Sequence, residues 1–218
     1  YNALTGLKMD LGAHRAHAVS LDLRDDTSID TAVRSAVEMF GPPTGLVITA
    51  GSHKPTPLSD LGHKGRDRLQ EVVRVNLTGP YIVAQLVADH MTDGGSIVFV
   101  GNQQAAKGMP GRHGHAASKH GLVAIARGMA RELGPTGIRV NVVLPDVIDN
   151  ELGATLIAET AQKSGQPVER IKKRFSATSA MRVMTKPDDI AEVIRFLLGP
   201  ESAAITGQAI DVSSGSTR

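Results

Sequence analysis

A histidine and a lysine four residues apart could carry proton chemistry in this chain. His115 and Lys119 lie on one face of a helix expected at residues 115–133, because residues i and i+4 share a face. An imidazole with a reference pKa of about 6.5 suits proton transfer near pH 7. The neighbouring Lys119 charge is expected to lower that pKa, which would leave His115 mostly neutral. The neutral imidazole and the amide of Asn102 could each donate a hydrogen bond to a developing oxyanion.

We do not expect a metal site near this pair. His113, His115 and Asp146 are the candidate ligands, but side chains two residues apart on a helix point in different directions. The chain contains no cysteine, which excludes disulfide bonds, thiolate metal sites and cysteine nucleophiles. The sequence therefore favours acid/base chemistry without a metal ion.

The composition is that of a single globular domain covering residues 1–218. Hydrophobic residues make up 41% and charged residues 21%, both ordinary for a soluble protein. The net charge of +2 gives no strong attraction to nucleic acid, and Lys172-Lys173-Arg174 is interpreted as a solvated helix face. No apolar run approaches the ~20 residues needed to cross a bilayer, and the first residues do not resemble a leader. We therefore expect a cytoplasmic protein without membrane contact.

Short runs of β-forming residues alternate along the chain with longer helical stretches. Such alternation is typical of an α/β fold with a parallel sheet. Strands are expected at residues 17–23, 46–49, 96–100, 138–144 and 208–212. Helices are expected at residues 27–40, 67–90, 115–133 and 187–198, and residues 3–12 are expected to end another helix. Thr27 with Asp30 forms a capping box for the helix at 27–40.

Five segments, in order along nearly the whole chain, resemble the short-chain dehydrogenase/reductase family. They are Leu46-Val47-Ile48-Thr49-Ala50-Gly51, Val75-Asn76-Leu77-Thr78-Gly79, Ala117-Ser118-Lys119, RELGPTGIRVN at 131–141 and Ile205-Thr206-Gly207-Gln208. The resemblance implies a Rossmann-like doubly wound parallel sheet, a nicotinamide cofactor (NAD or NADP) and a small-molecule alcohol or carbonyl substrate. It also implies a homodimer or homotetramer, in which the stripe Leu122, Ile125 and Met129 would be either core or part of a helical interface.

The glycine-rich turn with which this family begins is not found. Its spacing, Thr-Gly-x-x-x-Gly-x-Gly, lets the backbone approach the cofactor pyrophosphate, whereas the first glycines here, Gly6, Gly12 and Gly41, are too far apart. By resemblance the sheet therefore lacks its first two strands. The strand at 17–23 would have no neighbour, and the strand at 46–49 would have an open apolar edge. We expect upstream residues or a partner chain to fill that position, and the residue that selects NAD or NADP would also lie upstream.

The family's catalytic residues are kept at two of four positions. Lys119 stands at the position of the family's lysine, and Asn76 at that of an asparagine that supports a kink in the long helix. The tyrosine that moves the proton, four residues before the lysine, is replaced by His115. The serine that binds the substrate oxygen, thirteen residues earlier, is replaced by Asn102. By resemblance these four residues form the catalytic site.

Cofactor contacts are also implied by the resemblance. Asp22 matches an aspartate that meets the adenine. Ala50 and Gly51 would lie against the adenosine ribose, and Lys119 would reach the nicotinamide ribose.

The turn after the expected strand at 138–144 departs from the family. Pro145-Asp146 replaces the family's Pro-Gly, which puts a carboxylate near the expected place of the nicotinamide. Ile148 stands where the family's backbone meets the carboxamide. Pro145 and Ile148 are therefore expected to border the cofactor.

Three functions remain open on the sequence. The first is an oxidoreductase with an altered acid/base pair, His115 with Asn102. The second is a non-catalytic member of the fold that acts as a scaffold or oligomer partner. The third is a lyase or isomerase that uses His115 without net redox change.

Overall fold

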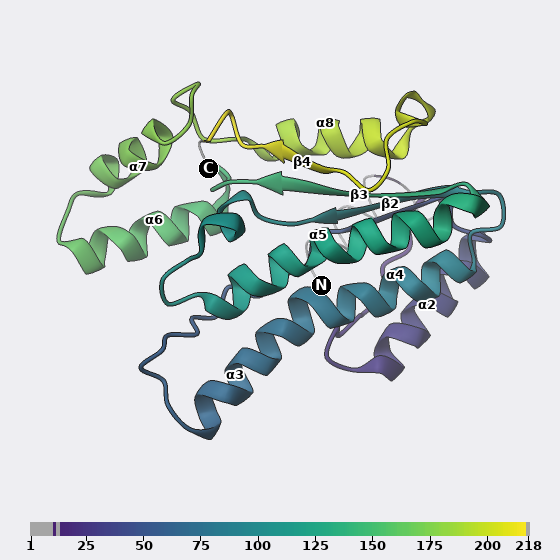
Figure 1. The fold of residues 1–218 in the computed structure, drawn as a ribbon, viewed down its shortest axis with the longest axis horizontal. Coiled ribbons are helices and arrows are strands. Elements are labelled where there is room, and N and C mark those ends of the chain that lie inside the picture. Colours follow the sequence, from purple (N-terminus) through teal and green to yellow (C-terminus); the bar gives the residue numbers. More distant parts are fainter. Residues whose placement is uncertain (1–10, 12–13, 217–218) are drawn as a thin grey trace.

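A four-stranded parallel sheet forms the centre of the structure, a computed structural model that describes residue 11 and residues 14–216 (Figure 1). The strands lie in the order β1 (Gly45–Ile48), β2 (Gly95–Val100), β3 (Ile138–Pro145) and β4 (Ala209–Val212), each parallel to the next. Each begins and ends within one residue of an expected strand. The predicted α/β class with a parallel sheet is therefore confirmed.

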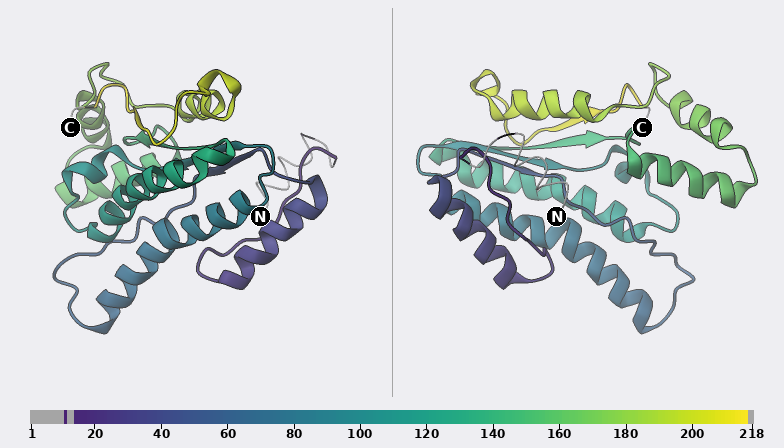
Figure 2. Two further views of the ribbon diagram at one scale, coloured as in Figure 1. Left: turned by 45° about the vertical axis from the view of Figure 1, so that its right-hand side comes forward. Right: turned by 180° about the vertical axis from the view of Figure 1, so that it is seen from behind.

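Helices cover both faces of this sheet. The α-helices of the described residues are α2 (Asp26–Phe40), α3 (His63–Val73), α4 (Gly79–Asp89), α5 (His113–Leu133), α6 (Glu151–Ser164), α7 (Val168–Ala177) and α8 (Pro187–Leu198). As Figure 1 shows, α4 and α5 pack on one face and α8 packs on the other. Figure 2 shows the α6–α7 hairpin beyond the carboxyl ends of the strands, apart from the two main layers. This is a doubly wound arrangement with an added helical hairpin.

The inner strands are apolar along nearly their whole length because both faces are covered. On β2, Ile97 and Phe99 are fully buried in one core cluster together with Leu122 of α5. Val98, between them, is fully buried in a second cluster together with Leu197 of α8. The alternation follows from the two-residue period of a strand, and it fixes which face each side chain serves.

The prediction of a strand at residues 17–23 is wrong. Residues 17–23 form no strand, because the part of the chain that the structure describes contains no neighbouring strand to complete a hydrogen-bonded ladder. β1 lies at the edge of the sheet, where Val47 is 36% exposed. The helix end expected at residues 3–12 lies, apart from Leu11, outside the described residues.

Three helices begin at residues other than those expected. α2 begins at Asp26, because the Asp25 side chain accepts a hydrogen bond from the Thr27 backbone N–H at 3.0 Å. The expected capping box is therefore wrong. The helix expected from residue 67 begins earlier, at His63, and α5 begins two residues early, at His113.

An arginine on β3 holds α8 against the sheet through hydrogen bonds. Arg139 Nη1 donates hydrogen bonds to the Leu197 carbonyl at 2.7 Å and to Ser202 Oγ at 2.6 Å. Its Nη2 donates to the Gly199 carbonyl at 3.1 Å. Carbonyls at a helix C-terminus lack intrahelical donors, and a cation there complements the helix dipole. The guanidinium of Arg139 thus provides hydrogen-bond donors to the carbonyls at the C-terminal end of α8.

We predict that Arg139→Met destabilises the fold. The substitution keeps most of the side-chain volume but removes the charge-assisted hydrogen bonds, which are worth roughly 1.5–3 kcal/mol. Denaturant unfolding should show a free energy of unfolding lower by about 2 kcal/mol. Arg195→Met is the control, because Arg195 pairs with Glu192 on the solvent side of α8 and should change the value by less than about 0.5 kcal/mol. Equal effects of the two variants would contradict the assignment.

Candidate functional site

The candidate residues gather at the carboxyl ends of the parallel strands. β1 is followed by residues 50–54, β2 by Asn102 and β3 by residues 145–148, so these segments share one edge of the sheet. Ligands of open α/β sheets bind at this edge. α5 adds His115 and Lys119 from the face that it covers. The structure therefore brings the four predicted catalytic residues to the same end of the sheet.

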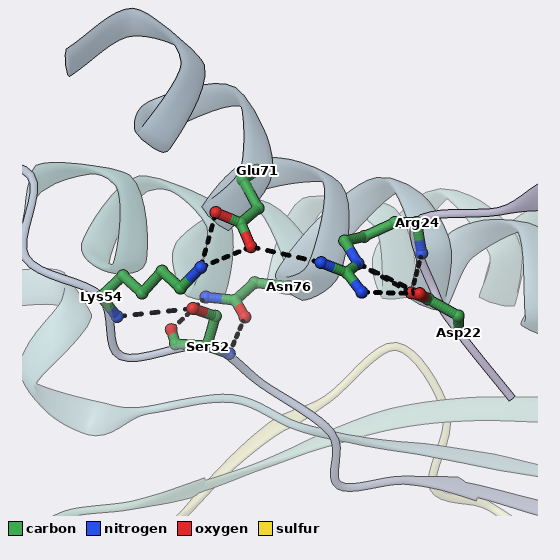
Figure 3. A network of polar contacts seen from close by, with 6 residues as sticks. All are labelled: Asp22, Arg24, Ser52, Lys54, Glu71 and Asn76. Carbon is green, nitrogen blue, oxygen red and sulfur yellow. Dashed lines mark hydrogen bonds and ion pairs between the residues drawn. The ribbon is translucent and has the colours of Figure 1, made fainter. Parts of the chain in front are cut away.

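Asn76 fixes the loop that follows β1. It lies in a π-helical turn, Arg74–Thr78, which joins α3 to α4 and forms the kink that the resemblance implied. Its buried side chain accepts a hydrogen bond from Ser52 N at 2.5 Å and donates to the Ser52 carbonyl at 3.0 Å (Figure 3). The same amide donates to Ser118 Oγ of α5 at 3.1 Å. One side chain thus joins the loop to two helical elements.

His115 is completely buried. Its Nδ1 lies 3.1 Å from the Ser52 carbonyl, which can only accept, and 3.5 Å from Asn76 Nδ2, so the shorter contact favours the tautomer with the proton on Nδ1. Nε2 is then an acceptor, and it has no hydrogen-bond partner among the described residues. Burial lowers the pKa of His115, the Ser52 bond opposes this, and the Lys119 charge lowers it further. The pKa of His115 is lowered as expected, but the main cause is burial rather than the Lys119 charge.

A second histidine, His53, covers His115. The two ring centroids lie 4.4 Å apart and the rings are tilted by 30°. Burial, followed by the nearby positive charges, lowers the pKa of His53 to about 4. His53 is not among the site residues predicted from the sequence. The available signal was its position two residues after Gly51, because polar residues that follow parallel strands meet at the ligand-binding edge.

Lys119 projects along the same edge toward the backbone. Its Nζ donates to the Val100 carbonyl at 2.7 Å and approaches the Ala50 carbonyl at 3.4 Å. Burial lowers the pKa of Lys119 to about 8. A Cβ at Gly51 would lie only 3.3 Å from Nζ, so a larger residue there would press on the ammonium group. An ammonium has three protons, which leaves one for a ligand.

A largely apolar cleft opens beside these residues. It is lined by His53, Asn102, Gln104, Met109, Arg112, Pro145, Asp146, Val147, Ile148, Asn150, Leu152, Gly153, Thr155, Leu156 and Glu159. Leu152, Leu156 and Glu159 come from one face of α6, so the helical hairpin forms a wall of the cleft. Asn102 Oδ1 is buried and without a partner among the residues described. The predicted residues Asn102, Pro145 and Ile148 therefore border the cleft, whereas His115 is not among its lining residues.

The carboxylate of Asp146 is held by three donors at the rim of this cleft. Its Oδ1 accepts from Val147 N at 2.8 Å and from Gln104 Nε2, and its Oδ2 accepts from Ser216 Oγ. The residue that replaces the family's glycine thus binds the strand end to the C-terminal segment. Its charge is partly compensated by these donors.

Asp22 lies in a separate polar network, which Figure 3 shows. Its carboxylate accepts hydrogen bonds from Arg24 N, Nε and Nη2 at 2.9, 3.0 and 2.7 Å, which lowers the pKa of Asp22 to about 2. Arg24 Nη1 lies 3.7 Å from Glu71, and Glu71 accepts from Lys54 Nζ at 2.6 Å. The network connects Asp22 to the loop after β1. Asp22 itself is not a lining residue of the cleft.

Two absences hold for the residues that the structure describes. No group of three or more His, Asp or Glu side chains there could hold a metal ion. None of the helices in that part of the chain has the length and apolar character needed to cross a bilayer.

Comparison with known proteins places these features in a family. A family model described as Enoyl-(Acyl carrier protein) reductase matches residues 3–217. An uncharacterized NAD-dependent oxidoreductase of Mycobacterium tuberculosis is 34% identical over 92% of this chain and 72% of its own length. A 3-oxoacyl-(acyl-carrier-protein) reductase of Thermotoga maritima is 30% identical over 89% of this chain and 74% of its own. The crystal structure of a blue fluorescent protein from a metagenomic library in complex with NADPH has a TM-score of 0.85 and 31% identity, and the match covers 100% of this chain and 83% of that one.

We predict that Asn76→Ala destabilises the protein by about 3 kcal/mol. The truncation leaves the Ser52 N–H, the Ser52 carbonyl and the Ser118 hydroxyl without their amide partner, and an unsatisfied buried polar group costs roughly 1–3 kcal/mol. Ser118→Ala removes only one of these bonds and should cost about 1 kcal/mol. Both values come from urea unfolding, and a loss in Asn76→Ala no larger than that in Ser118→Ala would refute the role of Asn76.

Acid should destabilise the fold through the buried His115 and the half-buried His53. The pKa of each is below its ordinary value of 6.5 in the folded protein, so protons bind the unfolded chain more readily. The stability is therefore complete above about pH 6.5 and falls as the pH drops toward 4, where His53 titrates. Unfolding free energies across this range should fall less steeply in His53→Phe and His115→Asn. The exposed His120→Asn is the control and should retain the original slope.

Proposed function

The chain belongs to the short-chain dehydrogenase/reductase family, and we propose that it is a nicotinamide-dependent oxidoreductase acting on a carbonyl or alcohol group of a small molecule. The observation that carries the proposal is the convergence of Asn76, His115 and Lys119 on one strand edge beside an apolar cleft. The names of the relatives support it, since one is called NAD-dependent and another a 3-oxoacyl reductase. A structural neighbour at 31% identity contains NADPH.

The residues at this edge fit the nicotinamide half of such a cofactor. At the cleft, the buried acceptor Asn102 Oδ1 has no partner in the described chain, and Lys119 has a proton to offer. Gly51 leaves open the space in front of Lys119. We propose that Lys119 holds the nicotinamide ribose and that Pro145 and Ile148 border the nicotinamide ring, while Ala50 and Gly51 lie against the adenosine ribose. When bound, the nicotinamide supplies the hydride exchange.

In this proposal an imidazole, rather than a phenol, exchanges the proton with the substrate oxygen. His115 occupies the position of the family's tyrosine, and Asn102 occupies that of the serine. The imidazoles at this site are neutral near pH 7, because burial lowers the pKa of His115 and brings that of His53 to about 4. A neutral imidazole can accept the proton of an alcohol as it is oxidised, and the imidazolium can return it in the reverse direction.

A non-catalytic role is the second candidate. The observation that favours it is the complete burial of His115 beneath His53. A protein that binds the cofactor but turns over no alcohol would act through its surface or its assembly with further copies.

The proposal is tested first by cofactor binding. Titration of NADH and NADPH, monitored by nicotinamide fluorescence, should show saturable binding of at least one. Lys119→Met removes the proposed ribose contact and should weaken that binding about tenfold or more, equivalent to about 1.4 kcal/mol. Lys163→Met, on an exposed position of α6, should leave the affinity unchanged.

Turnover provides the second arm of the test. The panel is isopropanol, cyclohexanol and 3-hydroxybutyryl-CoA, the last chosen because the name of the 3-oxoacyl reductase suggests its oxidised counterpart. Reduction of NAD⁺ or NADP⁺ with any member supports the oxidoreductase. Failure of the folded protein to bind either cofactor would overturn it, and binding without turnover would favour the second candidate.

A further inference from the structure

Only one of the two histidines at the site reaches the cleft. His115 has no exposed surface, and its unpartnered Nε2 is enclosed by protein. His53 is a lining residue, and its ring stacks on that of His115 with 4.4 Å between centroids. Any substrate in the cleft would therefore meet His53 first. His115, which occupies the position of the family's tyrosine, therefore lies deeper in the protein than His53.

We propose that His53 is the catalytic acid/base of this protein and that His115 is a positioning residue which holds His53 in place. The inference rests on the proposed oxidoreductase function and identifies which imidazole touches the substrate oxygen. It replaces the assignment that the resemblance alone gave to His115.

The backbone around His53 is anchored on both sides. The preceding residue, Ser52, is bound through its N–H and carbonyl by Asn76 and through its carbonyl by His115 Nδ1. The following residue, Lys54, donates to Glu71 at 2.6 Å (Figure 3). The His53 carbonyl itself accepts from Arg112 Nη1 at 3.2 Å. A group that exchanges a proton with a bound substrate must be held in this way, because small displacements reduce the rate steeply.

His115 contributes a ring surface and an anchor rather than a proton. Its Nδ1 lies against the Ser52 carbonyl, and its Nε2 is buried in a residue that does not line the cleft. Stacking against His53 restricts the plane of the outer ring. Both functions act on the substrate only through His53.

The proton and electron balance is complete with one cofactor. In the oxidation of an alcohol, neutral His53 accepts the hydroxyl proton as the O–H bond breaks. The substrate C–H bond breaks toward the oxidised nicotinamide with both electrons, and the carbon–oxygen double bond forms. The substrate loses two electrons and two protons, one of them within the hydride. Burial lowers the pKa of His53 to about 4, so its imidazole is neutral near pH 7 and has a lone pair for this step, although it is a weaker base than a free imidazole.

Paired substitutions test the two roles. His53→Phe keeps an aromatic ring against His115 but removes the base, so we expect kcat with the responsive member of the alcohol panel to fall by about 10²–10⁴-fold. The affinity for NADH or NADPH should change by less than about twofold. His115→Asn keeps a donor toward the Ser52 carbonyl and should retain kcat within about tenfold, whereas His115→Phe loses that donor and should be more impaired. His120→Phe, exposed on α5, is the matched control.

Chemical rescue separates a reacting group from a structural one. Because His53 lines an open cleft, added imidazole should restore part of kcat in His53→Ala. It should not restore His115→Ala, where the space is enclosed. An unchanged kcat in His53→Phe, or a loss in His115→Asn as large as in His115→Phe, would overturn the inference alone. Absence of turnover by the unmodified protein would overturn the proposed function and with it this inference.

Discussion

The binding of Ser52 by the Asn76 side chain is the constraint on which the site depends. A loop that follows an edge strand has no ladder to hold it, and β1 is such a strand. The π turn supplies a substitute, because it presents one amide that satisfies both backbone groups of Ser52 and reaches α5 through Ser118. His115 uses the same Ser52 carbonyl. The backbone position of His53 is therefore set by hydrogen bonds from the side chains of Asn76 and His115 to the preceding residue, Ser52.

Desolvation gives this edge its chemical character. Burial is the leading cause of the lowered pKa of Lys119, and the same holds for His53 and His115. The three bases also repel one another, so placing all of them in charged form would cost more than leaving the imidazoles neutral. Three acidic groups of this region have other partners, Glu71 with Lys54, Asp146 with its own donors and Glu159, which lines the cleft, with Arg112 at 3.8 Å. The imidazoles of this edge are therefore neutral near pH 7, and no carboxylate is needed to balance a charge on them.

Most of the fold and about half of the site could be predicted from the sequence. All four strands are continuous β-forming runs, the inner two, β2 and β3, are buried on both faces, and Asn76 and Lys119 stand in short motifs. His53 could not be found in this way, because its role depends on a loop whose path is set by distant partners such as Arg112. The strand expected at residues 17–23 failed for the complementary reason. Local β preference is not sufficient when no neighbouring strand is present to pair with it.

The stacked histidines also explain how an imidazole could replace the family's tyrosine as the acid/base while the rest of the site keeps its geometry. A phenol at position 115 would extend farther from α5 than an imidazole does. The shorter side chain of His115 leaves its Nε2 buried, and His115 does not line the cleft. His53, stacked on His115, presents an imidazole at the cleft in its place. The kept residues, Asn76 and Lys119, support the first ring and its surroundings, and so they remain useful although the reacting group lies on a different element.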